Sequence, residues 1–316
     1  MLKTKLKETA ITLSFLAVAL ISLNSAPARA LDFELFTATF IMGGEFEQGD
    51  TERFINELSK LEHPPEMFFL SDSSGGDLDE AMRIGLMLRA SNITVWAGNG
   101  CYSACVFALM SGVERGTMEG DMGLHRPSFN AEYFSSLSPS EAELEYKRLT
   151  AASTKFLTQM DAPQELIRRM FETDSGNIYI LSDEEKETLI PPTAPYYEEW
   201  VAAKCGSVSN ERKETLASIG SLRALVAEIQ LVEDGTLQRS AERSIQWEKW
   251  KEESAAAFEL LDSGVDLNEY TASDTLRYEC ADNAVKESKQ VFMAVVKEVA
   301  EGKIENPWGR SLLYGN

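Results

Sequence analysis

The feature that most constrains this chain is an alternation of short apolar runs with amphipathic helical patterns between residues 37 and 190. The runs expected to be strands are Thr37–Met42, Met67–Leu70, Ile93–Ala97 and Met122–Leu124. The patterns expected to be helices are Asp50–Leu61, Leu78–Arg89, Ala104–Met110 and Pro163–Phe171. Strands that alternate with helices favour a mostly parallel sheet whose two faces are covered, so we predict an α/β fold.

The second half of the chain has a different character. Two capping boxes, Ser138–Glu141 and Ser182–Glu185, mark the last helix starts before a proline-rich stretch at residues 191–195. Beyond it lie three long helical patterns: Asn210–Val232, Thr236–Leu261 and Ser273–Gly302. We therefore predict an α/β domain over residues 31–195 and an α-helical C-terminal region over residues 196–316, interpreted as a bundle or coiled coil used for packing or assembly.

Residues 1–30 have the three zones of a secretory signal peptide. A lysine-rich start precedes the apolar run Ala10–Leu23, and Ala28-Arg29-Ala30 provides the small residues of a cleavage site. An uncleaved anchor is the alternative, although the run is shorter than the ~20 apolar residues of a spanning helix. We predict cleavage before Leu31 and a periplasmic or secreted protein that has no membrane segment after cleavage.

The charge balance excludes nucleic acid as a partner. The chain carries 51 acidic and only 30 basic residues, a formal net charge of −21, and no basic stripe offsets it. Only two histidines and no Cys-x-x-Cys motif are present, so we expect no metal site and no cofactor.

If the protein is exported, its four cysteines are candidates for disulfides: Cys101, Cys105, Cys205 and Cys280. An even number in an oxidising compartment favours disulfides, and three pairings are possible. Pairing Cys101 with Cys105 and Cys205 with Cys280 is the simplest, because each pair then stays within one region. Buried free thiols and metal ligation are the alternatives.

Two junctions between a strand and a helix could support chemistry. Gly75 and Gly76 follow the Met67–Leu70 strand, where backbone N–H groups could approach an oxyanion, although a plain tight turn explains them equally well. Ser103 lies between the Ile93–Ala97 strand and the Ala104–Met110 helix, where the helix N-terminus stabilises developing charge. A simple helix N-cap is the alternative interpretation of Ser103.

A serine nucleophile needs a base, and the two histidines differ in position. His63 lies in a proline-flanked connection that is typical of a solvated loop. His125 follows the Met122–Leu124 strand, and ligand sites collect at the carboxyl ends of parallel strands. We therefore expect His125 to lie near Ser103 and to act as the general base.

Together, Ser-Gly-Gly-Asp at residues 74–77, Gly-x-x-Ser-Ala-Cys at residues 100–105 and Leu-His-Arg-Pro at residues 124–127 resemble the Clp-type serine proteases of the crotonase superfamily. The chain is still more similar to the exported members of that superfamily that carry Cys-x-Ser-Ala-Cys. The resemblance covers residues 37–190. It implies a spiral of ββα units, Ser103 as nucleophile, His125 as base, an oxyanion hole from backbone N–H groups near Gly75, Gly76 and Ala104, a peptide or protein substrate, and possible homo-oligomers.

One departure from the family pattern concerns the residue that orients the histidine. The position nearest to the family's aspartate holds Asn177, and Asp174 lies three residues earlier. An asparagine can orient a histidine but stabilises an imidazolium less than a carboxylate does. The leading hypothesis is an exported serine hydrolase, most simply a peptidase. The alternatives are an inactive crotonase-like module used for binding or assembly, acyl-thioester chemistry, and a nucleophilic role for Cys101 or Cys105.

Overall fold

The computed structural model describes residues 30–313, so the predicted signal peptide lies outside the described residues except for Ala30. The chain divides into two compact units. The first comprises residues up to Pro192 together with those from Phe292 onward, and the second is Thr193–Val291. The predicted helical region at 196–316 is therefore shared between the units, because its last residues return to the first.

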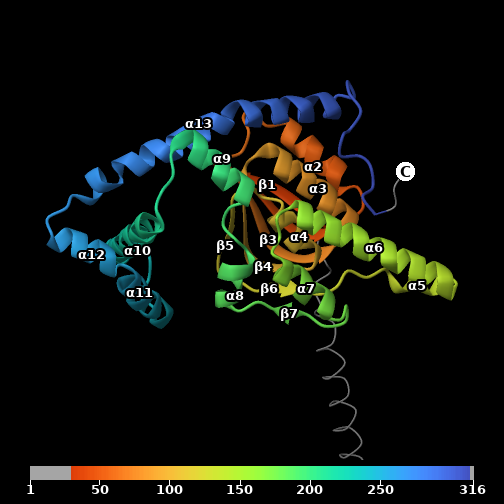
Figure 1. Cartoon of the computed structure of the whole chain (residues 1–316), viewed down its shortest axis with the longest axis horizontal. Helices are drawn as coiled ribbons and strands as arrows, with labels where there is room; N and C mark the ends of the chain where they lie inside the picture. The colour runs from red at the N-terminus through yellow and green to blue at the C-terminus, as the bar shows by residue number, and fades with distance from the viewer. Residues whose placement is uncertain (1–29, 314–316) are drawn as a thin grey trace, which may run out of the picture. The chain divides into compact units, whose positions relative to one another are not determined.

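A single twisted sheet forms the centre of the first unit (Figure 1). Its strands are β1 (Asp32–Phe36), β2 (Thr39–Phe46), β3 (Met67–Gly76), β4 (Thr94–Tyr102), β5 (Arg115–Thr117), β6 (Met122–Leu124) and β7 (Tyr179–Ile180). Their order is β1-β2-β3-β4-β6-β7, with β5 beside β4. Strands β2, β3, β4, β5 and β6 are parallel, and β1 and β7 pair antiparallel at the two edges.

Helices connect β2 to β3, β3 to β4 and β4 to β5, whereas a short loop connects β5 to β6. The helices of this part are α2 (Asp50–Ser59), α3 (Leu78–Ser91), α4 (Ala104–Met110), α5 (Ala131–Ser136), α6 (Pro139–Gln159), α7 (Gln164–Glu172) and α8 (Asp183–Leu189). Every residue of α4 is buried, as its all-apolar sequence requires. Both predicted capping boxes form, at the starts of α6 and α8. The predicted α/β class and the helical region that follows it are confirmed.

Strands β3 and β4 run further than their apolar runs predicted. Pairing continues through polar and glycine residues, with Gly75 and Gly76 of β3 opposite Glu45 and Phe46 of β2. Strand β4 likewise continues to Tyr102, because its last residues pair with β6. The stretches that resemble catalytic motifs therefore lie at strand ends rather than in free loops.

The second unit is helical. It comprises α9 (Pro195–Cys205), α10 (Asn210–Glu233), α11 (Ala241–Glu253), α12 (Ala255–Asp262) and most of α13 (Leu267–Ala300). The predicted single helix over Thr236–Leu261 is wrong, because the chain begins a helix only at Ala241 and is interrupted at Ser254. The predicted pairing of Cys205 with Cys280 forms, and we call it the helical disulfide.

Within this unit, a small core of Ile219, Leu222 and Ala257 joins α10 to α12. Among the described helices, α10 is the one long and apolar enough to cross a membrane by length and composition, and part of its apolar sequence builds this core. The end of α13 belongs to the first unit, where Phe292, Met293 and Val296 are buried in the main core.

Candidate functional site

Ser103 stands alone between β4 and α4, at the turn that we call the elbow (residues 102–104). Its backbone has φ 55° and ψ −119°, and its side chain makes no capping hydrogen bond. A residue with a Cβ in such a conformation costs of order 1–3 kcal/mol, and such residues concentrate at functional sites. Ser103 therefore occupies the N-cap position of α4, but its hydroxyl does not accept a hydrogen bond from the first turn of the helix.

The elbow is held from several sides. Cys101 and Cys105, both buried, form the predicted disulfide across it, with Cα atoms 5.4 Å apart, and we call this the elbow disulfide. The Ser103 N–H donates to the Gly123 carbonyl of β6 at 2.9 Å. Because both sulfur atoms are committed to the disulfide, the interpretation of either cysteine as a nucleophile is wrong for this state of the protein.

Gly75 lies directly against the elbow. A Cβ built on Gly75 would lie 2.7 Å from the Ser103 Cβ and 3.1 Å from the Ala104 nitrogen, and the φ of Gly75 is 102°. Only glycine permits both this φ and this approach. The contact brings the backbone of two of the predicted oxyanion-hole residues, Gly75 and Ala104, close to the Ser103 Cβ, while Gly76 lines the adjoining cavity.

A cavity of about 590 Å³ opens in front of the elbow, and Ser103 and His125 both line it. Its carboxylates are Glu45, Asp77 and Asp79, and its large apolar lining residues are Leu78, Phe107, Phe129, Leu149 and Leu313. No lysine or arginine is among the described residues that line it. The cavity thus suits a neutral or cationic ligand better than an anionic one.

The carboxylates of the cavity wall influence one another. Asp77 caps α3 by accepting a hydrogen bond from the Glu80 N–H at 3.0 Å. Burial raises the pKa of Asp77 above its usual value, against the lowering effect of that N–H, and the charges of Glu80 and Asp79 raise it further. This part of the wall therefore concentrates negative charge.

The position of His125 follows from the sheet. Tyr102 of β4 pairs with Gly123 of β6, so the two strands end together and His125 follows one residue after β6. The His125 Nδ1 lies 3.0 Å from the Arg126 carbonyl oxygen. Because a carbonyl only accepts, we assign the ring proton to Nδ1, which leaves the lone pair on Nε2.

The Ser103 hydroxyl and the His125 ring share the cavity, and within residues 30–313 no hydrogen bond joins them. Catalytic hydrogen bonds are often long in ligand-free sites and shorten when substrate binds. The other histidine, His63, is exposed in the connection before β3, as the sequence predicted for a loop histidine.

The two candidate orienting residues belong to a segment that contacts Arg126, the residue that follows His125 in the chain. The Asp174 carboxylate pairs with Arg126 at 3.0 Å, and its carbonyl accepts the Asn177 N–H at 2.9 Å. In the described part of the chain, neither side chain hydrogen-bonds to the His125 ring. The carbonyl of Arg126 takes that place, and sequence reasoning missed it because a backbone carbonyl has no sequence signature.

Comparison with known proteins found no match in sequence and only low-scoring similarity in structure. No protein-family model matches the sequence, and no curated protein matches it. An enoyl-CoA hydratase from Shewanella pealeana is similar in structure, with 10% identity and a TM-score of 0.33, covering 76% of this chain and 95% of that one. An enoyl-CoA hydratase from Thermoplasma volcanium has the same identity and TM-score, covering 77% and 96%. A methylmalonyl-CoA decarboxylase reaches 10% and 0.31, covering 73% and 90%. These neighbours belong to the crotonase superfamily, and at such scores nothing about the activity of this chain follows from them.

Proposed function

We propose that the protein is an exported serine hydrolase, most simply a peptidase, with Ser103 as nucleophile and His125 as general base. The observation that carries the proposal is the backbone of Ser103. A strained turn between a strand and a helix, with the hydroxyl uncapped and facing a cavity, is the geometry that presents a nucleophile. Both disulfides support an oxidising compartment, in keeping with the exported Cys-x-Ser-Ala-Cys type.

In the proposed reaction, His125 Nε2 takes the proton from the Ser103 hydroxyl as Oγ attacks the substrate carbonyl carbon. The resulting oxyanion is stabilised by backbone N–H groups near Gly75, Gly76 and Ala104. The protonated His125 then gives its proton to the leaving amine as the carbon–nitrogen bond breaks. Water, deprotonated by the same nitrogen, releases the acyl group and restores the Ser103 hydroxyl.

The third member of this machinery is proposed to be the Arg126 carbonyl. It orients the ring by accepting a hydrogen bond from the Nδ1–H group, as the carboxylate of a triad does. A carbonyl dipole stabilises an imidazolium less than a full negative charge, so we expect a slow hydrolase. Asp174 and Asn177 remain proposals for this role, reached after a side-chain rearrangement.

The charge of the cavity argues against acyl-thioester chemistry with coenzyme A. Coenzyme A is a polyanion, and the described lining residues include Glu45, Asp77 and Asp79 but no lysine or arginine. A second candidate, an inactive module that binds a partner, is favoured by one observation, the lack of a hydrogen bond between Ser103 and His125 in the described structure.

The test is covalent labelling with a fluorophosphonate and mass-spectrometric location of the adduct. We expect labelling at Ser103 that falls by about 100-fold or more in His125→Ala, the scale of general-base catalysis. The matched control is His63→Ala, which removes the exposed histidine and should label as the parent does. Folded protein that stays unlabelled from mildly acidic to mildly alkaline pH would establish the inactive module instead.

The same assay decides the orienting group. If the Arg126 carbonyl suffices, Asp174→Asn and Asn177→Ala should each retain labelling within about tenfold of the parent. A loss approaching the ~10⁴-fold that follows removal of a triad carboxylate would assign the role to the residue changed.

A further inference from the structure

We infer that Leu313 is a specificity-determining residue of the Ser103 cavity, and that Asp79 is the positioning residue that holds it there. Residues 311–313, which we call the strap, would then limit the size of the group that binds beside Ser103. The inference rests on the proposed function, since it concerns the substrate of the same site.

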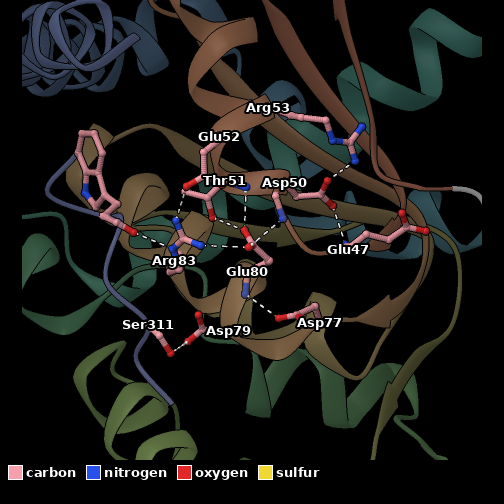
Figure 2. Close-up of polar contacts among 12 residues, drawn as sticks. Glu47, Asp50, Thr51, Glu52, Arg53, Asp77, Asp79, Glu80, Arg83 and Ser311 are labelled. Carbon is pink, nitrogen blue, oxygen red and sulfur yellow. Dashed lines mark hydrogen bonds and ion pairs between the residues drawn. The ribbon is translucent and has the colours of Figure 1, made fainter. Parts of the chain in front are cut away.

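The chain just before the strap is held in place at Trp308, which we call the anchor. After α13, the Trp308 carbonyl accepts a hydrogen bond from Arg83 Nε of α3 at 2.8 Å. The Trp308 ring packs edge-on against Phe292, with ring centres 5.8 Å apart. Arg83 is held in turn by the carboxylates of Glu80 and Glu52, at 3.0 and 2.6 Å (Figure 2). Trp308 therefore stays in place whether or not the strap does.

Beyond this anchor, one carboxylate oxygen holds the strap. Asp79 Oδ1 accepts hydrogen bonds from the Ser311 hydroxyl at 3.0 Å, the Leu312 N–H at 2.7 Å and the Leu313 N–H at 3.1 Å. Figure 2 shows Ser311 directed at Asp79, at the start of α3. Hydrogen bonds to an ionised acceptor contribute more than neutral ones, so the three together form an effective clamp.

The clamp places an apolar side chain in the cavity wall. Leu313 is only 7% exposed and lines the same cavity as Ser103, together with Leu149 of α6. Leu312, its neighbour, is exposed and is not among the lining residues. The strap thus closes the cavity with one side chain, which comes from a segment more than 200 residues away from Asp79.

Two changes test the strap: the first removes only an apolar side chain of the wall, and the second removes the clamp together with one carboxylate of the wall. Leu313→Ala leaves the strap bound and removes only the side chain in the cavity. Asp79→Ala removes the one oxygen that accepts all three hydrogen bonds and so loosens the strap, while the Trp308 carbonyl still has its hydrogen bond from Arg83. Either change should enlarge the site for a bulky group without altering the elbow, since neither residue contacts Ser103 through a hydrogen bond.

The experiment compares Ser103 labelling by a small alkyl fluorophosphonate with labelling by a bulky aromatic one. In Leu313→Ala and in Asp79→Ala we expect the ratio of bulky to small labelling rates to rise about tenfold or more, the scale that a few methylene groups of a pocket wall are worth. Leu312→Ala is the matched control within the strap, and Glu52→Gln is the control for disturbing the Arg83 network. Both should keep the parental ratio.

A second readout does not depend on hydrolysis. A reporter thiol placed in the cavity wall by Leu149→Cys is alkylated with iodoacetamide and with a bulky maleimide, in the parent and in combination with Asp79→Ala. We expect strap release to raise the bulky rate selectively. If Ser103 labels in none of the proteins, the hydrolase proposal fails while this readout still decides the strap. A bulky-to-small ratio within twofold of the parent in both readouts would overturn the inference.

Discussion

Replacing Ser103 by glycine should make the protein more stable while it abolishes labelling by a fluorophosphonate. At φ 55° and ψ −119° a residue with a Cβ is strained, whereas glycine is not. The hydroxyl makes no capping bond, so its loss forfeits little. This combination is expected of a residue that is kept for chemistry at the expense of stability.

The size of the effect follows from two terms. Relief of the backbone strain contributes about 1–3 kcal/mol. The greater conformational freedom of glycine in the unfolded chain takes back about 0.5–1 kcal/mol. We therefore expect Ser103→Gly to raise the free energy of unfolding by up to about 2.5 kcal/mol relative to the parent. Ser103→Ala should leave it nearly unchanged, because alanine keeps the strain.

Ser138 provides the matched control, because it is a serine N-cap with an ordinary backbone, φ −67° and ψ 159°, whose side chain does cap. There, Ser138→Gly should lower the free energy of unfolding by a few tenths of a kcal/mol. Hydrogen exchange of the most protected amides of β3 and β4 reports on the first unit for all variants. If Ser103→Gly lowers the stability as Ser138→Gly does, Ser103 is not strained and the argument for the elbow fails.

Three further predictions test the stability of the two units. Gly75→Ala should destabilise the first unit by about 2–4 kcal/mol, since the added Cβ would lie 2.7 Å from the Ser103 Cβ and the φ of Gly75 is positive. In urea unfolding, Gly176→Ala, in open space, should change the free energy of unfolding by no more than about 0.5 kcal/mol, and equal effects of the two changes would contradict the close approach. Loop entropy predicts that removing the helical disulfide, which spans 75 residues, lowers the free energy of unfolding by about 4.5 kcal/mol, and that removing the elbow disulfide, which spans 4, lowers it by about 2 kcal/mol. The reverse order in melting experiments would count against the loop-entropy argument. Burial raises the pKa of Asp50 despite its hydrogen bonds to Glu47 and Arg53, so the contribution of Asp50 to the free energy of unfolding is most favourable below the usual pKa of 3.8 and is lost as pH rises through the raised pKa. The stability of the parent relative to Asp50→Asn should therefore fall from acid to neutral pH, and a rise would refute this sign.

Much of the fold could be predicted from the sequence, because its signals are local. Helix α4 and strand β6 have the bounds that their apolar runs predicted, and both capping boxes form where Ser-x-x-Glu occurs. Of the three possible disulfide pairings, the simplest one, in which each pair lies within one region, is the one that forms. Short elements such as β1 and β7 escaped prediction, because two to five residues are too few to show a period.

The sequence by itself determined the strand–helix alternation and the placement of Ser103 and His125 at the ends of strands, and it favoured the cysteine pairing that the structure shows. Periodicity indicates which face of a helix or strand is buried, and capping residues indicate where a helix begins. Both depend on residues that are close together along the chain. Only the tertiary structure decided the φ of Ser103, the carbonyl that faces His125, and the position of Leu313 in the cavity wall. Backbone angles and carbonyls have no side-chain signature, and Leu313 reaches the cavity only because packing of α13 on the core returns the chain end to α3.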